Sequence, residues 1–161
     1  MIKKISLIVS FSVILVFSAC SGINGNKNDR NPSENTEGAV VKMTADMFKQ
    51  QIWDYEKSPG DFKFKGDQPC VIDFYADWCR PCKMVAPVME ELAAEYKGKV
   101  RIYKVNTDEE GELSQVFNIR SIPAILYIPK AGKPSMTVGF AGKENFEKTI
   151  RETLLNDTIH K

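Results

Sequence analysis

Two cysteines separated by two residues, Cys79 and Cys82, are the side chains best suited to covalent chemistry in this chain. The segment 70–76 before them is almost entirely apolar and rich in β-forming residues, which predicts a buried strand, and a helix is predicted over 81–96. A thiol at a helix start faces unpaired N–H groups and partial positive charge, which lower its pKa. We therefore predict that Cys79 is the attacking nucleophile and that Cys82 resolves the mixed disulfide.

A Cys-x-x-Cys motif is not specific to redox chemistry, and two other interpretations compete with it. Zinc requires four ligands, and the further candidates, Cys20, Cys70 and His160, are scattered along the chain. An inert structural disulfide between residues so close restricts the unfolded chain little, so it would stabilise the fold only weakly. The position of the motif between a strand and a helix favours the redox interpretation over both.

The segment 71–87, VIDFYADWCRPCKMVAP, resembles the active-site segment of thioredoxins, and 121–123, Ser-Ile-Pro, matches a second segment of that family. The resemblance covers about 39–155. It implies an α/β thioredoxin fold, a central mixed β-sheet flanked by helices on both faces, for a domain at 39–161. The function implied is that of a protein-disulfide reductase, which needs no metal and no cofactor beyond its own disulfide.

The resemblance also implies roles for residues near the buried strand. Asp73 is expected to be a buried carboxylate that moves the proton of Cys82, with Lys104 as its neighbour. An unpaired acid in an apolar strand should have a raised pKa, suited to proton transfer near pH 7. A solvent-facing aspartate at a strand edge is the alternative. Cys70 differs from Asp73 in parity, so we expect it on the opposite face as a small core residue, with a redox or partner-linked thiol as the alternative.

A substrate-binding surface is implied as well, with a cis peptide bond before Pro123, which faces the cysteines and leaves the Ile122 backbone to pair with an extended substrate. The expected contact residues are Trp78, Arg80, Pro81, Ile122, Pro123 and Gly139. A trans proline at a strand edge and a tryptophan that simply packs are the alternatives. Arg80 stands where thioredoxins usually carry glycine. A shift of half a pKa unit at Cys79 would change the reduction potential by only about 15 mV, so we expect Arg80 to act on substrate choice.

The remaining elements follow from the spacing of apolar residues. Strands are predicted over 39–43, 70–76, 100–105, 124–128 and 135–140, and helices over 45–56, 81–96, 109–117 and 143–155. Strands joined by helices are expected to pair in parallel, and the final hairpin adds an antiparallel edge. Met84, Val88, Leu92 and Tyr96 recur every four positions and predict the buried face of the helix over 81–96.

The N-terminus predicts export. A positively charged start precedes an apolar run over 5–17, which is shorter than the roughly 20 residues of a membrane span. Residues 17–20, Phe-Ser-Ala-Cys, resemble the lipobox of bacterial lipoproteins. We expect a signal peptide at 1–19, a lipid on Cys20 and a flexible polar tether at 20–38. Ordinary signal cleavage near Ala19 and an uncleaved anchor are the alternatives.

The composition of the chain and its predicted compartment limit the kinds of partner that it can have. The chain has 22 Lys and Arg against 21 Asp and Glu, so it offers no basic field for nucleic acid. The expected partners are disulfide-containing exported proteins, a membrane electron-transfer reductase, and the membrane itself through Cys20. We expect a monomer in the periplasm, and Ser21 favours the outer membrane. An oxidising disulfide donor, a chaperone-like peptide-binding module and a purely structural lipoprotein are the competing functions.

Overall fold

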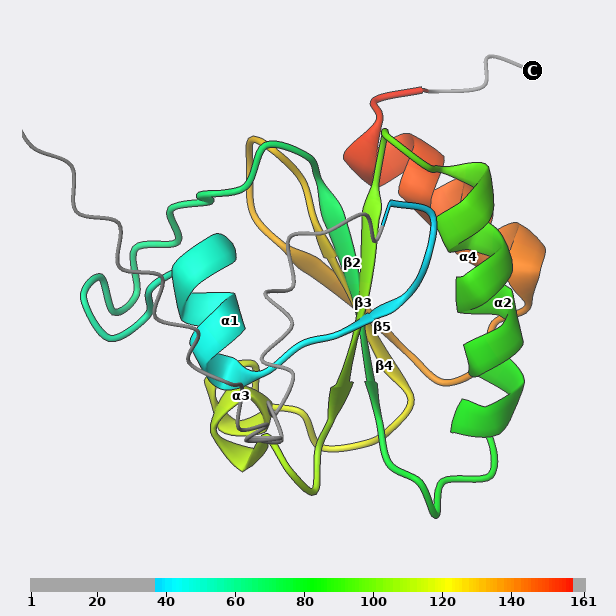
Figure 1. The fold of residues 1–161 in the computed structure, drawn as a ribbon, viewed down its shortest axis with the longest axis horizontal. Coiled ribbons are helices and arrows are strands. Elements are labelled where there is room, and N and C mark those ends of the chain that lie inside the picture. The colour runs from blue at the N-terminus through cyan, green and yellow to red at the C-terminus, as the bar shows by residue number, and fades with distance from the viewer. Residues whose placement is uncertain (1–36, 158–161) are drawn as a thin grey trace, which may run out of the picture. The chain divides into compact units, whose positions relative to one another are not determined.

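A β-sheet between two layers of helices forms the core of the computed structural model, which describes residues 37–157 (Figure 1). Cys20, the expected signal peptide and most of the expected tether lie outside these residues. The elements are β1 (Val41–Lys42), α1 (Ala45–Gln51), β2 (Cys70–Tyr75), α2 (Cys82–Glu95), β3 (Arg101–Asn106), α3 (Gly111–Val116), β4 (Ala124–Ile128), β5 (Ser135–Val138), α4 (Lys143–Thr149) and the π-helical η1 (Ile150–Leu154). The predicted α/β architecture is confirmed.

The sheet is mixed, with the strand order β1-β3-β2-β4-β5. β3 is parallel to β1 and β2, whereas β4 is antiparallel to β2, and β5 is antiparallel to β4. The prediction that all helix-connected strands pair in parallel is therefore wrong for β4. The six residues of α3 span only about 9 Å, which is too short to return the chain to the far end of the sheet. As a result, β4 begins at the same end of the sheet as the loop after β2.

Each face of the sheet carries its own apolar layer, with α1 and α3 on one side and α2 and α4 on the other (Figure 1). Side chains alternate along β2. Cys70, Ile72 and Phe74 belong to the layer of α1 and α3, and Val71 belongs to the layer of α2 and α4. Asp73 shares the parity of Val71, so it faces the α2 side. As predicted, Cys70 is a fully buried core residue on the opposite face.

The buried face of α2 differs from the predicted stripe. Leu92 and Tyr96 of that stripe are buried as predicted, whereas Met84 is 50% exposed and Val88 is only partly buried. Positions four apart drift by about 40° per step on a helix with 3.6 residues per turn, so a strict four-residue stripe cannot stay in the core over the whole helix. The stripe lies outside the core at Met84 and enters it at Leu92. Alternating steps of four and three keep to the core, and the buried residues are Cys82, Val85, Met89, Leu92 and Ala93.

Two predicted helices have different ends in the structure. α1 stops at Gln51, because the N–H of Trp53 donates to the Phe48 carbonyl (3.1 Å) and the chain then leaves the helix. Trp53 packs edge-on against Tyr55 instead, with 5.8 Å between ring centroids. The predicted helix over 143–155 is divided between α4 and η1. No helix between residues 37 and 157 is long and apolar enough to cross a membrane.

Candidate active site

The loop between β2 and α2 holds Cys79 and Cys82 in a disulfide, with 5.3 Å between their Cα atoms. The chain turns tightly there, since the N–H of Cys79 donates to the Ala76 carbonyl (3.1 Å). Cys82 is the first residue of α2, and its N–H donates to the Sγ of Cys79 (3.2 Å). Pro81, the capping residue, supplies no side-chain acceptor. The sulfur of Cys79 therefore takes the place of a helix cap, and the predicted position at a helix start is confirmed.

The side of the disulfide that faces the protein interior is apolar. Ala76, Cys79 and Cys82 form one buried cluster, and Tyr75 and Ile122 pack against it. Each cysteine is only 3% exposed. Tyr75 was not among the predicted site residues, although its parity with Asp73 along β2 is a signal that could have identified it.

Asp73 is 3% exposed, and its Oδ1 atom has no hydrogen-bond partner. The alternative of a solvent-facing aspartate is therefore wrong. Burial raises the pKa of Asp73 to about 7, and the nearby Lys104 opposes this rise. Lys104 is its neighbour in the β2–β3 register, as the resemblance implies. A carboxyl group with a pKa near neutrality can both accept and return a proton at physiological pH.

Trp78 is 70% exposed, so the alternative that it simply packs in the core is wrong. Its Nε1–H donates to the Oδ2 of Asp108 (2.9 Å), and the N–H of Asp108 donates to the Oδ1 of Asn106 (3.0 Å). Asp108 thus orients the indole ring. The sequence carried no signal for this role, because Asp108 lies in a loop without a motif. The groove beside the ring has a volume of about 370 Å³ and is lined by Trp78, Thr107, Ser114, Ile119, Arg120, Ser121 and Ile122.

The segment before β4 completes the site. The peptide bond between Ile122 and Pro123 is cis, as the resemblance implies. The Pro123 carbonyl accepts a hydrogen bond from the N–H of Gly139 (2.8 Å). Gly139 has a φ of +91°, in the left-handed region that favours glycine. The ends of β4 and β5 are thereby joined beside the cysteine cluster that Ile122 contacts.

Arg80 and Pro81 are exposed on the outer side of the loop. Within residues 37–157, no group of three or more His, Cys, Asp or Glu side chains is arranged to hold a metal ion. Cys70 belongs to a different apolar cluster and lies at the start of β2, whereas the disulfide follows the end of this strand. The zinc alternative therefore has no ligand set in this part of the chain.

A mixed sheet, a cysteine pair at a strand–helix junction and a cis-proline segment beside that pair together define the thioredoxin-fold class of proteins. Comparison with known proteins agrees, since the sequence profile described as Thioredoxin matches residues 39–152. The chain belongs to the thioredoxin family.

Individual relatives are similar over nearly their whole length. The chain is 41% identical to the thioredoxin of Borreliella burgdorferi over 113 residues, which cover 70% of this chain and 96% of that protein. It is 37% identical to thioredoxin 1 of Nostoc sp. over 116 residues, covering 72% and 98%. The crystal structure of chloroplastic thioredoxin z superposes with a TM-score of 0.60 at 27% identity, covering 71% of this chain and 93% of that one.

Proposed function

We propose that this chain is a protein thiol–disulfide oxidoreductase that reduces or reshuffles disulfides of exported proteins. The observation that carries the proposal is the cysteine pair at the start of α2, where the N–H of Cys82 donates to the sulfur of Cys79. A hydrogen bond from the helix start favours the thiolate over the thiol, and the thiolate is the attacking species.

Reduction proceeds in two exchanges. The Cys79 thiolate attacks one sulfur of a substrate disulfide, so the substrate S–S bond breaks, a mixed disulfide forms and one substrate thiolate leaves. Cys82 then loses its proton and attacks the Sγ of Cys79, which releases the second substrate thiolate. Two electrons pass to the substrate, and Cys79 and Cys82 are left joined in a disulfide.

Asp73 is the proposed proton acceptor for Cys82. It lies on the α2 side of β2, and its pKa of about 7 allows exchange in either direction near neutral pH. Lys104, its neighbour on β3, stabilises the deprotonated carboxylate of Asp73 through its positive charge.

The surface around the disulfide supports protein substrates. Exposed large apolar side chains flank the cysteine loop and the adjoining ends of β4 and β5: Trp78, Met84, Val138 and Phe140. Val138 pairs with Ala124, the first residue of β4, which follows Pro123 directly. Exposed apolar surface of this kind marks interaction with other proteins. We propose that an extended substrate segment lies here and pairs with the backbone of Ile122.

The proposed location is the periplasmic side of a bacterial outer membrane, with a lipid on Cys20. It rests on the lipobox-like residues 17–20 and on the short apolar run before them. A membrane electron-transfer reductase would regenerate the dithiol, because reduced cysteines do not persist unaided in an oxidising compartment. Labelling of the expressed chain with a radioactive fatty acid tests this, and Cys20→Ala should abolish the label.

The equilibrium reduction potential tests the direction of electron flow. We expect a value of about −270 mV, which suits a reductase that receives its electrons from a membrane protein. A value of about −120 mV would make the chain an oxidising disulfide donor, the second candidate. The exposed Arg80 beside Cys79 shifts the potential in that direction, but by only about 15 mV. Loss of insulin reduction in Cys79→Ala is expected in both cases. A biological activity that survives Cys79→Ala would instead support the chaperone-like module.

A further inference from the structure

Three charged side chains beside the disulfide have no hydrogen bond or ion pair within residues 37–157. Asp77 precedes the cysteines, Arg80 lies between them and Lys83 follows them, and all three are exposed. Many other surface charges in this part of the chain are paired, as Lys42 is with Glu109 (2.5 Å). Asp77 acts on Lys42 and Tyr75 only through space, without a bond to either. The side chains of all three residues are therefore open to hydrogen bonds and ion pairs with a bound substrate.

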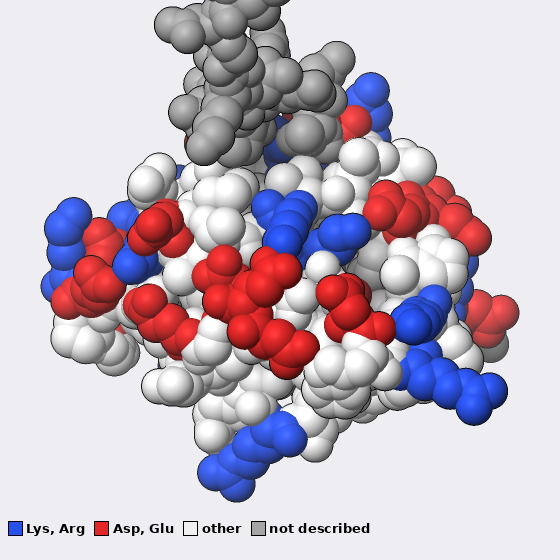
Figure 2. Space-filling view, turned by 60° about the horizontal axis from the view of Figure 1, so that its bottom comes forward, with Lys and Arg blue, Asp and Glu red and all other residues white. Residues whose placement is uncertain are grey.

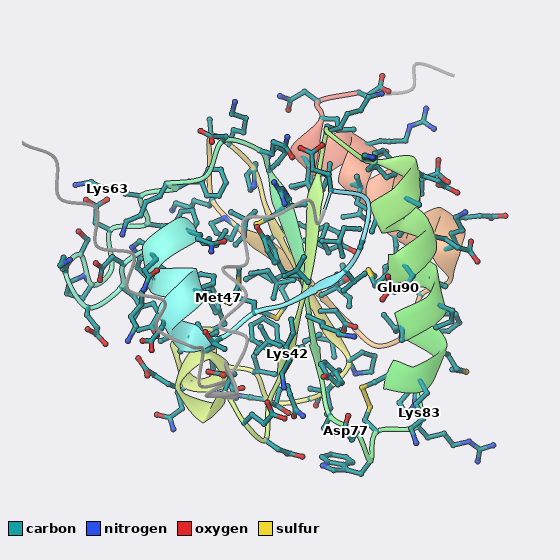
Figure 3. All side chains as sticks on the ribbon, in the orientation of Figure 1. Lys42, Met47, Lys63, Asp77, Lys83 and Glu90 are labelled. Carbon is teal, nitrogen blue, oxygen red and sulfur yellow. A yellow bond between two sulfur atoms is a disulfide. The ribbon has the colours of Figure 1, made fainter. Side chains whose placement is uncertain are left out.

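These charges are separated by sign. Asp77 and Lys83 lie on opposite sides of the disulfide in Figure 3. Asp108, in the loop after β3, adds exposed negative charge on the side of Asp77, because its carboxylate accepts the hydrogen bond of Trp78. Glu109 in the same loop is neutralised by its ion pair with Lys42. Figure 2 shows this end of the molecule, with acidic side chains gathered over its middle and basic side chains beside them and along the edges.

We propose that this polarity selects substrates by the order of charges around their cysteine, an inference that rests on the proposed function. A favoured substrate carries a basic residue on the flank that meets Asp77 and an acidic residue on the flank that meets Arg80 and Lys83. Complementary charges accelerate the encounter, and like charges brought together oppose it. Because the site holds both signs, the order of the substrate charges matters more than their sum.

The test uses the reduced full chain and three synthetic disulfide peptides of the same length. One peptide places Lys before and Asp after the reactive cysteine, the second reverses the two, and the third has Ser at both positions. We expect the rate constants of the two charged peptides to differ by about threefold to tenfold at low salt, and the difference to shrink in 0.5 M salt, about 3–5 times physiological ionic strength.

Variants locate the cause of the preference. Arg80→Glu combined with Lys83→Glu should remove the difference between the two charged peptides. The control, Lys130→Glu with Lys133→Glu, makes the same change of net charge in the exposed turn between β4 and β5, at the other end of the sheet, and should keep the difference. The ratio of the rate constants for the two charged peptides is unaffected by any change that Arg80 makes to the reactivity of Cys79, because both rate constants change equally.

The outcomes separate this inference from the proposed function. Reduction of the Ser peptide with equal rates for the two charged peptides would overturn the charge selection and leave the oxidoreductase function standing. A preference that the control variant also loses would overturn it too, because the cause would then be net charge. Failure to reduce any of the three peptides, or insulin, would overturn the proposed function and this inference together.

Discussion

Cys70 and Cys79 stand at the two ends of the segment formed by β2 and the loop after it, in opposite chemical surroundings. Cys70 begins β2 within the apolar layer beneath α1 and α3, where burial raises the pKa of its thiol. Cys79 lies at the start of α2 and receives a hydrogen bond from the N–H of Cys82. Their exposed fractions are 0% and 3%, so burial hardly distinguishes them. The groups that face each sulfur determine its reactivity.

The largest expected effect comes from removing each cysteine in turn. Cys79→Ala should lower insulin reduction by about 10³-fold or more, because the nucleophile itself is lost. Cys70→Ala should leave the rate within about twofold and lower the free energy of unfolding by about 1 kcal/mol, since it leaves a small cavity in a packed core. Turbidity of reduced insulin and urea unfolding measure the two quantities.

Alkylation of the reduced protein at pH 7 checks the same contrast without mutation. Iodoacetamide should modify Cys79 in the folded state and Cys70 only in denaturant, as followed by peptide mass spectrometry. Rapid modification of Cys70 in the folded protein would contradict its assignment as an inert core residue and revive the redox alternative.

The next effect concerns Asp73, which lies on the opposite face of β2 from Cys70. Asp73→Asn should slow the release of substrate from the mixed disulfide by about tenfold to 10²-fold, because Cys82 loses its proton acceptor. The pH profile of that step should lose its inflection near pH 7. Stopped-flow Trp78 fluorescence over pH 5–9 measures both, and an unchanged inflection would assign it to another group.

The free energy of unfolding should also differ between Asp73→Asn and the parent protein, in a way that depends on pH. The pKa of Asp73 is about 7 when folded, above its ordinary value of 3.8, so the native state binds more protons than the unfolded state between those values. Stability of the parent protein is therefore lost as pH rises from about 4 to 7. Asp73→Asn should be more stable than the parent at pH 8, by up to about 4 kcal/mol, and nearly equal to it at pH 4. Equal stabilities at pH 8 would mean that the carboxylate is solvated.

A smaller effect is expected at Asp108, which the sequence did not reveal. Asp108→Ala removes the acceptor for the Trp78 indole N–H, so the exposed ring should become more mobile beside the disulfide. We expect insulin reduction to fall by about twofold to fivefold, in line with the loss of one hydrogen bond worth about 1 kcal/mol. The conservative Asp108→Asn retains an acceptor oxygen and should recover most of the rate. An unchanged fluorescence anisotropy of the indole would contradict this role.

The smallest effect is expected at Gly139. Its φ of +91° disfavours any residue with a Cβ atom, although no atom lies within 4 Å of the position of an added Cβ. Gly139→Ala should therefore lower the free energy of unfolding by about 1–2 kcal/mol through backbone strain alone. Gly60→Ala is a matched control in a surface turn, with φ of +76° and the same open space. Only Gly139→Ala should also slow insulin reduction, because Gly139 bonds to Pro123.

Short-range patterns explain what could be predicted of the site. Cys79 and Cys82 lie at a junction between a strand and a helix, and the sequence predicts both elements from local hydrophobic patterns. Asp73 is the one charged residue in the apolar pattern of the strand. Long-range contacts explain what was missed. Asp108 joins the site through a hydrogen bond to Trp78, 30 residues away in the chain. Tyr75 is a different case, because its parity with Asp73 along β2 is a local signal that could have identified it. The exposure of Met84 depends on which face of α2 meets the sheet, and the predicted stripe was wrong at Met84 and Val88 and right at Leu92 and Tyr96.

By itself, the amino-acid order determined the chemistry of this chain and the element that carries it, because a thiol pair, a buried strand and a helix start all lie within a few residues of each other. Only the tertiary structure decided that β4 runs antiparallel to β2, which carries Ile122 and Pro123 to the disulfide. The six residues of α3 are too few to carry the chain to the far end of the sheet, so β4 starts at the end where β3 stops. The charge pattern around the site likewise combines two segments, residues 77–83 and the loop after β3, which meet only in the folded molecule.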